Sequence, residues 1–341
     1  MPTTLTTATA QTSAASAAGD SAPQAIAPLA APGADGGGNA GPADADSRAI
    51  VAKAVSKVTA IATLPEVTVQ IIKTVEDPRS SAAQLHKIIS HDPALVTRIL
   101  KVVNSSFYGL PGQIGSVERA IVLLGLNAVK NIAVAASLGQ LFRGVKLCEG
   151  YTAKELWQHC VGVAVTARHL AREMKIPIAD EAFLAGMIHD IGLLVSLQIW
   201  PEKLRQACER AMSLVSSGAA GAVEGGADGT SFCQIERQIM QVDHQQLGAG
   251  LAEMWKFPRS CQLVAGHHHE PAILADNNRL LVTLVFVADT LCCQAAHGFN
   301  LTALRQRLDE GRLSEVKIES ELIDRTQRNL PQILDSAKGL F

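Results

Sequence analysis

Aromatic residues make up only 4% of this 341-residue chain, and charged residues only 18%. The hydrophobic fraction of 48% is therefore carried mostly by Ala, Val, Leu and Ile, and it is large enough to fill sizeable cores. Small and branched aliphatic side chains with few aromatics favour close-packed helices over an aromatic-rich β-sandwich. We therefore expect an all-α fold.

The chain has no run of Lys or Arg, and its formal net charge is only -2. The first 47 residues hold four of the 32 acidic residues and none of the 30 basic ones, so the rest of the chain is close to neutral. A protein that binds nucleic acid regardless of sequence needs a basic surface that contacts the phosphates. The composition therefore argues against a nucleic-acid partner.

The seven cysteines are odd in number and include no C-x-x-C pair. This pattern predicts reduced thiols in a cytoplasmic protein. No basic residue precedes Arg48, so the amino terminus lacks the pattern of a secretory signal. No uninterrupted apolar span of 18 residues occurs either, and we expect no association with a membrane.

Two stretches of biased composition divide the chain. Residues 1–47 are almost wholly Ala, Gly, Pro, Ser and Thr, which predicts a disordered tail. A Gly- and Ala-rich stretch at about 216–230 predicts a flexible surface insertion. We expect an amino-terminal helical lobe over 48–145, a second helical lobe over 146–300 and further helices over 301–341.

Helix signals recur along the first lobe. Asp92 followed by Pro93 predicts an N-cap and the first residue of a helix. Ser116 predicts the cap of the next helix, which should end near Gly125, and another helix should cover 126–142. The first lobe should therefore be a bundle of about five or six short helices.

The second lobe shows a regular apolar stripe at helical spacing, formed by Leu156, Cys160, Val163, Ala167, Leu170 and Met174. His159 lies beside this stripe. Residues 180–199 are apolar on nearly every side of a helix, which predicts one central buried helix. The pair His189 and Asp190 falls in its middle, where polar groups need partners.

Five histidines and two aspartates set among apolar residues are the candidate metal ligands: His159, His189, Asp190, His244, His268, His269 and Asp289. Imidazole and carboxylate groups suit Fe, Mn, Zn or Ni, and a pair of such ions can activate water against a phosphoester. A carboxylate in so apolar a segment as that around Asp190 would be costly without a cation or a donor cluster. The alternative is a buried polar network that only fixes helix packing.

The order of motifs along the chain resembles the HDOD (HD-related output domain) family over about residues 50–300. In the first lobe the resemblance is carried by Leu64-Pro65, Ile88-Ile89, Asp92-Pro93-Ala94-Leu95, Asn104-Ser105, Ala120-Ile121 and Leu124-Gly125. In the second lobe it is carried by Leu156-Trp157-Gln158-His159, the run from Ala185 through His189-Asp190 to Gly192, Asp243-His244 to Gly248, Trp255 to Pro258, and His268-His269-Glu270-Pro271.

The second half of this family is similar to HD phosphohydrolases, including HD-GYP phosphodiesterases of cyclic di-GMP. The resemblance implies a pair of divalent ions. One ion would be held by His159, His189, Asp190 and Asp289. Asp190 would bridge to a second ion held by His244, His268 and His269.

Two departures concern substrate handling. Leu193 stands where active HD-GYP enzymes have a Lys, which removes a source of charge stabilisation. Pro271-Ala272-Ile273 replaces the Gly-Tyr-Pro signature. The resemblance therefore implies a bacterial signal-transduction output module without catalysis, and with no receiver, GGDEF or EAL pattern in the chain we expect its signalling partner in trans.

Other interpretations stay open from the sequence. The chain would alternatively be a metal-dependent phosphodiesterase or phosphohydrolase of HD type, acting on a cyclic dinucleotide or another phosphoester. In a third interpretation the metal is a structural staple of the second lobe. The turn from Asn104 to Gly109 is either a packed loop or a recognition surface between the lobes.

Overall fold

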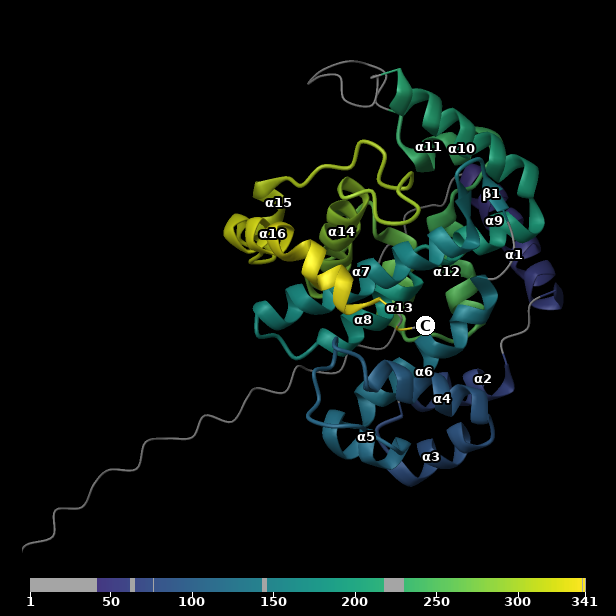
Figure 1. Ribbon diagram of the computed structural model, residues 1–341. Helices are drawn as coiled ribbons and strands as arrows, with labels where there is room; N and C mark the ends of the chain where they lie inside the picture. The colour runs from purple at the N-terminus through teal and green to yellow at the C-terminus, as the bar shows by residue number, and fades with distance from the viewer. Residues whose placement is uncertain are drawn as a thin grey trace, which may run out of the picture. The chain divides into compact units, whose positions relative to one another are not determined.

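A computed structural model of the protein describes residues 42–61, 65–75, 77–142, 146–217, 230–338 and 340 (Figure 1). Helices dominate these residues, and the strands among them are one short antiparallel pair, β1 (Lys146–Cys148) and β2 (Tyr151–Thr152). The predicted all-α class is confirmed. Most of the predicted tail 1–47, most of the predicted insertion 216–230, and Leu64 of the family pattern lie outside the described residues.

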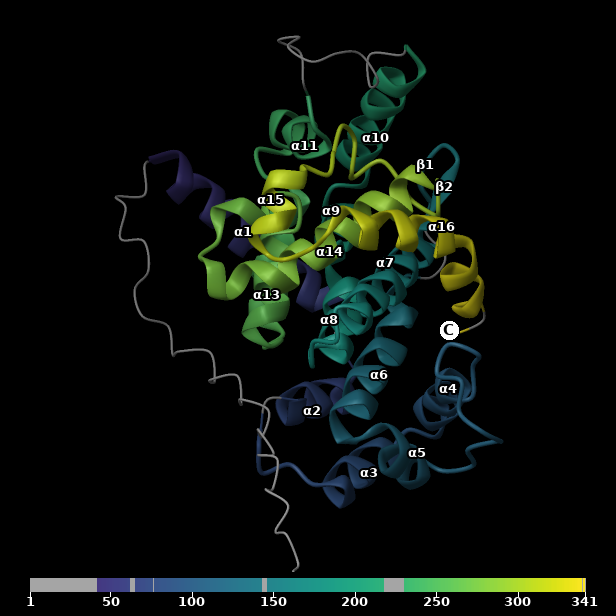
Figure 2. The same cartoon turned by 90° about the vertical axis from the view of Figure 1, so that its left-hand side faces the viewer.

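The first lobe is built around one buried helix, α6 (Leu126–Leu138), whose residues from Ala128 to Leu138 are all buried. Both views show the other helices of this lobe grouped around α6 (Figures 1 and 2). They are α2 (Glu66–Val75), α3 (Ala82–Ser90), α4 (Pro93–Val103) and α5 (Val117–Leu124). A single 3₁₀ turn, η1 (Gly139–Phe142), continues α6 and completes the predicted helix over 126–142.

The predicted helix boundaries in this lobe are confirmed. The Asp92 side chain accepts a hydrogen bond from the backbone N–H of Leu95 at 2.9 Å, which caps α4. Ser116 caps α5 in the same way, through the N–H of Arg119 at 3.2 Å. The helix ends before Gly125, whose φ of +88° is readily adopted only by glycine.

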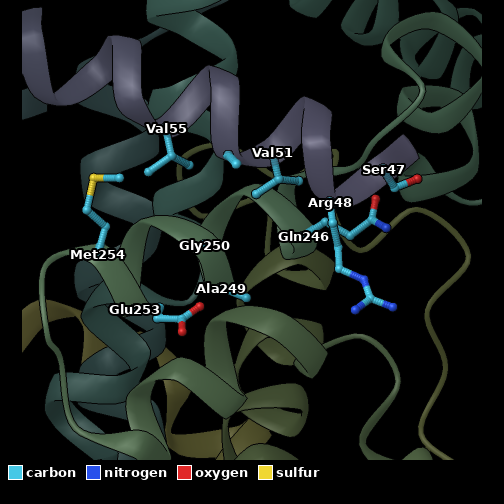
Figure 3. Close-up of a pocket in the computed structure, with 10 residues that line it drawn as sticks. Ser47, Arg48, Val51, Val55, Gln246, Ala249, Gly250, Glu253 and Met254 are labelled. Carbon is cyan, nitrogen blue, oxygen red and sulfur yellow. The ribbon is translucent and has the colours of Figure 1, made fainter. Parts of the chain in front are cut away.

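The first described helix, α1 (Pro42–Ile61), differs from the prediction in two ways. Residues 42–47, expected in the tail, are helical. The helix also packs on α9 and α12 rather than on the first lobe, because Val51 fits against Gly250, where a side chain would collide with it. Between α1 and α12 lies a cavity of about 650 Å³ lined by Val51, Val55 and Met254 (Figure 3).

The second lobe surrounds α7 (Ala153–Glu173), whose predicted apolar stripe is buried from Leu156 to Leu170, while Met174 follows the helix and is partly buried. Thr152 and Glu155 form a capping box at its start. The other elements are α8 (Ala179–Ile188), α9 (Ile191–Ile199), α10 (Pro201–Ser216), α11 (Phe232–Met240), α12 (His244–Met254), α13 (Arg259–His267), η2 (Pro271–Ile273) and α14 (Asp276–Gln294).

The prediction of one continuous helix over 180–199 is wrong. The chain breaks at His189 and Asp190, which join α8 to α9 through a turn. Apolar periodicity could not locate this break, because both flanking helices are buried on nearly every side. The stretch Ala179–Ile199 is apolar and long enough to cross a membrane, but 89% of its most apolar 18-residue window is buried inside the protein, as in a core segment.

The carboxyl-terminal part is helical only in its later portion. It contains α15 (Glu310–Glu315) and α16 (Ser320–Ser336), and α16 packs on α7 and α14. Residues 301–309, which we expected in helices, contain no helix and run past the second lobe as a loop.

The turn 104–109 packs against the second lobe. The Arg168 guanidinium of α7 lies 4.7 Å from the Phe107 ring centroid and 4.6 Å from that of Tyr108. The Arg168 Nε also pairs with an Asp180 carboxylate oxygen at 3.2 Å. Burial raises the pKa of Tyr108. These contacts favour the packed-loop interpretation of the turn, because its aromatic side chains are occupied within the chain.

Candidate metal centre

The structure brings all seven predicted side chains together, although they come from five separate parts of the second lobe. Six of these side chains are 0% exposed and His269 is 8% exposed. They are His159 on α7, His189 and Asp190 between α8 and α9, His244 at the start of α12, His268 and His269 directly after α13, and Asp289 on α14.

One half of the cluster is formed around His159. Its Nε2 lies 3.1 Å from Asp289 Oδ1 and 3.2 Å from His189 Nε2. The His189 Nε2 in turn lies 3.3 Å from Asp190 Oδ2. Two imidazoles and two carboxylates therefore point at one volume, which is the set that the family resemblance assigns to the first ion.

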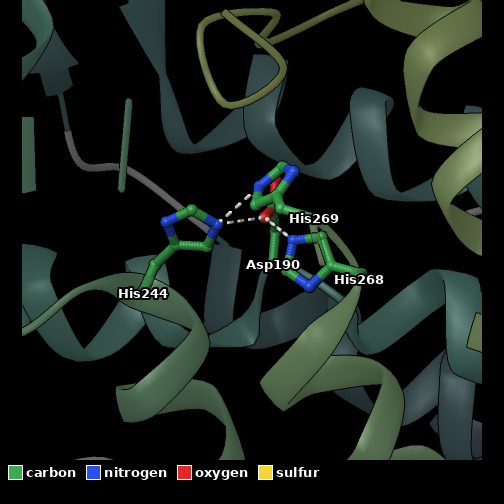
Figure 4. Close-up of side chains that lie close together, drawn as sticks. All are labelled: Asp190, His244, His268 and His269. Carbon is green, nitrogen blue, oxygen red and sulfur yellow. Dashed lines mark hydrogen bonds and ion pairs between the residues drawn. The ribbon is translucent and has the colours of Figure 1, made fainter. Parts of the chain in front are cut away.

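The other half is formed around the second oxygen of Asp190 (Figure 4). Asp190 Oδ1 lies 3.4 Å from His244 Nε2 and 3.3 Å from His268 Nε2. The Nε2 atoms of His244 and His269 are 3.0 Å apart. Asp190 thus presents one oxygen to each half, as a carboxylate that bridges two ions would.

Backbone carbonyls fix the orientation of two of these imidazoles. His189 Nδ1 donates to the Gly186 carbonyl oxygen at 2.8 Å, and His268 Nδ1 donates to that of Val264 at 3.1 Å. Because a carbonyl oxygen only accepts, Nδ1 carries the proton in both rings. Their Nε2 lone pairs are then free to face the centre, as in metal-binding histidines.

Glu236 on α11 has the same role for His244. Its buried carboxylate accepts from His244 Nδ1 at 2.5 Å and from the His244 backbone N–H at 3.1 Å. Burial raises the pKa of Glu236, although His244 opposes that rise. Sequence reasoning missed Glu236. The only sign of it in the sequence is an acidic residue at an inward-facing position of a helix, eight residues before His244.

Gln306 closes the cluster from the loop 301–309. Its Oε1 accepts from His269 Nδ1 at 2.5 Å, and its Nε2 donates to Asp289 Oδ2 at 3.1 Å. Nothing in the sequence pointed to Gln306, because it lies in a loop beyond the family motifs. The Gln306 amide therefore orients one imidazole and one carboxylate together.

The arrangement passes a test for metal binding. Donors around one ion at 2.0–2.2 Å are separated by about 3.0–3.6 Å. The distances between donor atoms within each half, 3.0–3.4 Å, fall in that range. The Nε2 lone pairs of His244 and His269 face each other, which is repulsive unless a proton or a metal ion lies between them. Both oxygens of Asp190 are buried and accept no hydrogen bond among the described residues, and such a carboxylate requires a cation.

The electrostatics of the seven side chains are consistent with this test. Burial raises the pKa of Asp190, but His189, His268 and His244 outweigh burial and hold that pKa well below its usual value. Burial likewise opposes protonation of His244, yet Glu236 and Asp190 raise its pKa to about 9. Burial and the neighbouring imidazoles lower the pKa of His269. A proton on His244 therefore occupies the place that a metal ion would take.

Gly192 allows α9 and α12 to approach closely beside this centre. A Cβ atom added to Gly192 would lie 1.8 Å from the His244 carbonyl oxygen and 2.7 Å from the Gly248 backbone nitrogen. Only a glycine fits here, which gives the glycine that follows His189-Asp190 a packing role in placing His244.

Comparisons with known proteins agree with the fold. The chain is 24% identical over 254 residues to an uncharacterized protein of Treponema pallidum (strain Nichols), covering 71% of this chain but only 44% of that protein's length. A solved HDOD domain protein of Geobacter sulfurreducens has a TM-score of 0.67 at 19% identity and covers 87% of this chain and 99% of its own.

Two other solved structures share the fold. A candidate phosphohydrolase of Shewanella amazonensis SB2B gives a TM-score of 0.63 at 20% identity, with 86% of this chain and 98% of that chain covered. A candidate signal transduction protein of Marinobacter aquaeolei VT8 gives 0.67 at 22%, with 89% and 67% covered. A family model for the HDOD domain matches residues 61–271, more than half of the chain. The chain therefore belongs to the HDOD family.

Proposed function

We propose that this protein is a cytoplasmic signal-transduction output module that holds a pair of divalent metal ions in a closed centre and acts on a protein partner in trans. The observation that carries the proposal is that all seven donors of the metal pair are present and that their side chains are buried. Seven donors converge at metal-ligand spacing, and their side chains are between 0% and 8% exposed. In this conformation the centre can stabilise the second lobe, and its donor side chains have little direct contact with solvent.

The surroundings of the centre support a role without catalysis. Leu193 is fully buried and apolar. By the family resemblance, active HD-GYP enzymes have a Lys at this position. Gln306 bonds to both His269 and Asp289 and closes the cluster on the side of the loop 301–309. Neither residue offers a cation to a developing phosphate charge.

The second candidate function is phosphoester hydrolysis, and the placement of Asp190 favours it. A carboxylate with one oxygen in each half is the arrangement expected for a two-metal hydrolase. When bound, such a metal pair supplies Lewis-acid activation of water and of the phosphoryl group. The chain itself would contribute the orientation of the donors through Glu236 and Gln306, and substrate entry would require the loop 301–309 to move.

Metal analysis combined with turnover assays separates the two functions. We expect about two ions per chain in the wild-type protein and in the control D276A, because Asp276 is an exposed residue on the same helix as Asp289. We expect metal to be lost in D190A. Turnover of cyclic di-GMP and bis(p-nitrophenyl) phosphate should be no higher for the wild type than for D190A, with Mn, Fe, Zn or Ni supplied in turn.

Turnover by the wild type that is absent in D190A would establish the hydrolase instead. Absence of metal in the wild type would exclude the hydrolase and the metal-dependent module, and would leave an adaptor that acts on its partner without metal. The partner is tested by capture from the native cytosol with wild type and D190A as baits. A protein retained by metal-loaded wild type and released by chelation is expected, and equal capture by both baits would separate signalling from the metal centre.

A further inference from the structure

A thiol lies beside the carboxylate of the first half of the centre. Cys293 follows Asp289 by one helical turn on α14, so the two side chains share a face. The Cys293 Sγ lies 3.3 Å from Asp289 Oδ1. The sulfur, an Asp289 oxygen and a ring nitrogen of His159 all lie within 4.8 Å of one another.

This spacing suits a sulfur ligand. Around an ion with a metal–sulfur distance near 2.3 Å, sulfur and oxygen donors are separated by about 3.5 Å. Asp289 and His159 already point at that ion's position. In the second half the group of Asp190, His244, His268 and His269 holds no sulfur, and Cys233 belongs instead to a separate group with Glu236 and His244. The two halves therefore differ in chemical softness.

Cys293 also differs from the other cysteines in its access to the surface. All seven cysteines lie in the described part of the chain, and six of them are buried while Cys293 is partly exposed. It lines a cavity of about 560 Å³ together with Gln294, Asn300 and Gln306. Cys293 thus lies both beside the first half and at this cavity.

We propose that Cys293 is a further metal ligand of the first half, which makes this half a mixed nitrogen, oxygen and sulfur site that prefers Zn²⁺ or Fe²⁺ over Mn²⁺. On binding, the S–H bond breaks, the proton passes to solvent water and a sulfur–metal bond forms. The inference rests on the proposed metal centre. The competing role is a neutral thiol that only donates a hydrogen bond to Asp289 and positions that carboxylate.

Cobalt substitution separates the two roles by spectroscopy. Co²⁺ is added to the full-length, metal-free protein, and bound cobalt is measured alongside the absorption spectrum. We expect a sulfur-to-cobalt charge-transfer band in the wild type and in C292S, and its loss in C293S. Cys292 is the matched control because it is fully buried and its Sγ contacts Thr166 Oγ1 at 3.7 Å, away from the centre.

Bound cobalt without the band in the wild type would overturn the sulfur ligand and leave the metal centre intact. No bound cobalt would overturn both. A second measurement needs no variant: X-ray absorption at the zinc edge of the zinc-loaded wild type should show a sulfur neighbour at about 2.3 Å. A shell of nitrogen and oxygen neighbours alone would overturn the sulfur ligand.

Discussion

Replacing Gly192 by Ala should displace α12 and with it His244. The added Cβ would lie 1.8 Å from the His244 carbonyl oxygen, about 1.6 Å short of the 3.4 Å at which ordinary contact begins. The obstacle is backbone, so no side-chain rotation relieves it. Overpacking of this kind costs about 1–3 kcal/mol, and we expect the upper end of that range as a loss in the free energy of unfolding.

Urea unfolding of the chelator-treated protein measures this loss, and a metal titration measures its effect on the centre. We expect metal affinity to fall as well, because His244 is the first residue of the displaced helix. Gly115→Ala is the control, since a Cβ atom added there meets nothing within 4 Å. A Gly192→Ala protein as stable as the control, with unchanged metal affinity, would refute the reasoning.

Three further predictions concern the partners of the centre and the contact between the lobes. Glu236→Ala should weaken metal binding by about 10–100-fold, whereas Glu236→Gln keeps an acceptor for His244 and should lose less; equal losses by competition titration would contradict this. Because the pKa of His244 is raised to about 9 from 6.5, its protonation stabilises the metal-free protein fully below about pH 6.5 and ceases to do so as pH rises through 9. Metal binding in the second half must displace that proton, so the affinity of that half should rise about tenfold per pH unit up to pH 9, and a flat profile would argue against it. Arg168→Ala removes the guanidinium from Phe107 and Tyr108 and should lower the free energy of unfolding by about 2–3 kcal/mol. Urea unfolding measures this loss against the exposed control Arg79→Ala, and no difference between the two variants would contradict the interlobe contact.

The sequence predicted those features that local rules determine. The caps at Asp92 and Ser116 and the stripe along α7 follow from side-chain hydrogen bonding and helical periodicity. The seven donors were predicted as a set because they are polar side chains within apolar segments, but their division between two ions was predicted only through the family resemblance, since no periodicity relates His159 to Asp289.

What the sequence did not predict depends on tertiary contacts. The break at His189 and Asp190 has apolar helices on both sides, and α1 joins the second lobe through its fit against Gly250. Gln306 acts from a loop, where no pattern marks a functional residue. Each depends on which segments become neighbours after folding, and that information is not local.

Anomalous diffraction from crystals of the Zn²⁺-loaded protein tests the central claim most directly. The account predicts two peaks about 3.5–4 Å apart, one beside His159, His189 and Asp289 and the other beside His244, His268 and His269, both within bonding distance of Asp190. Zinc bound elsewhere, or a centre without anomalous signal in crystals soaked to saturation, would contradict it.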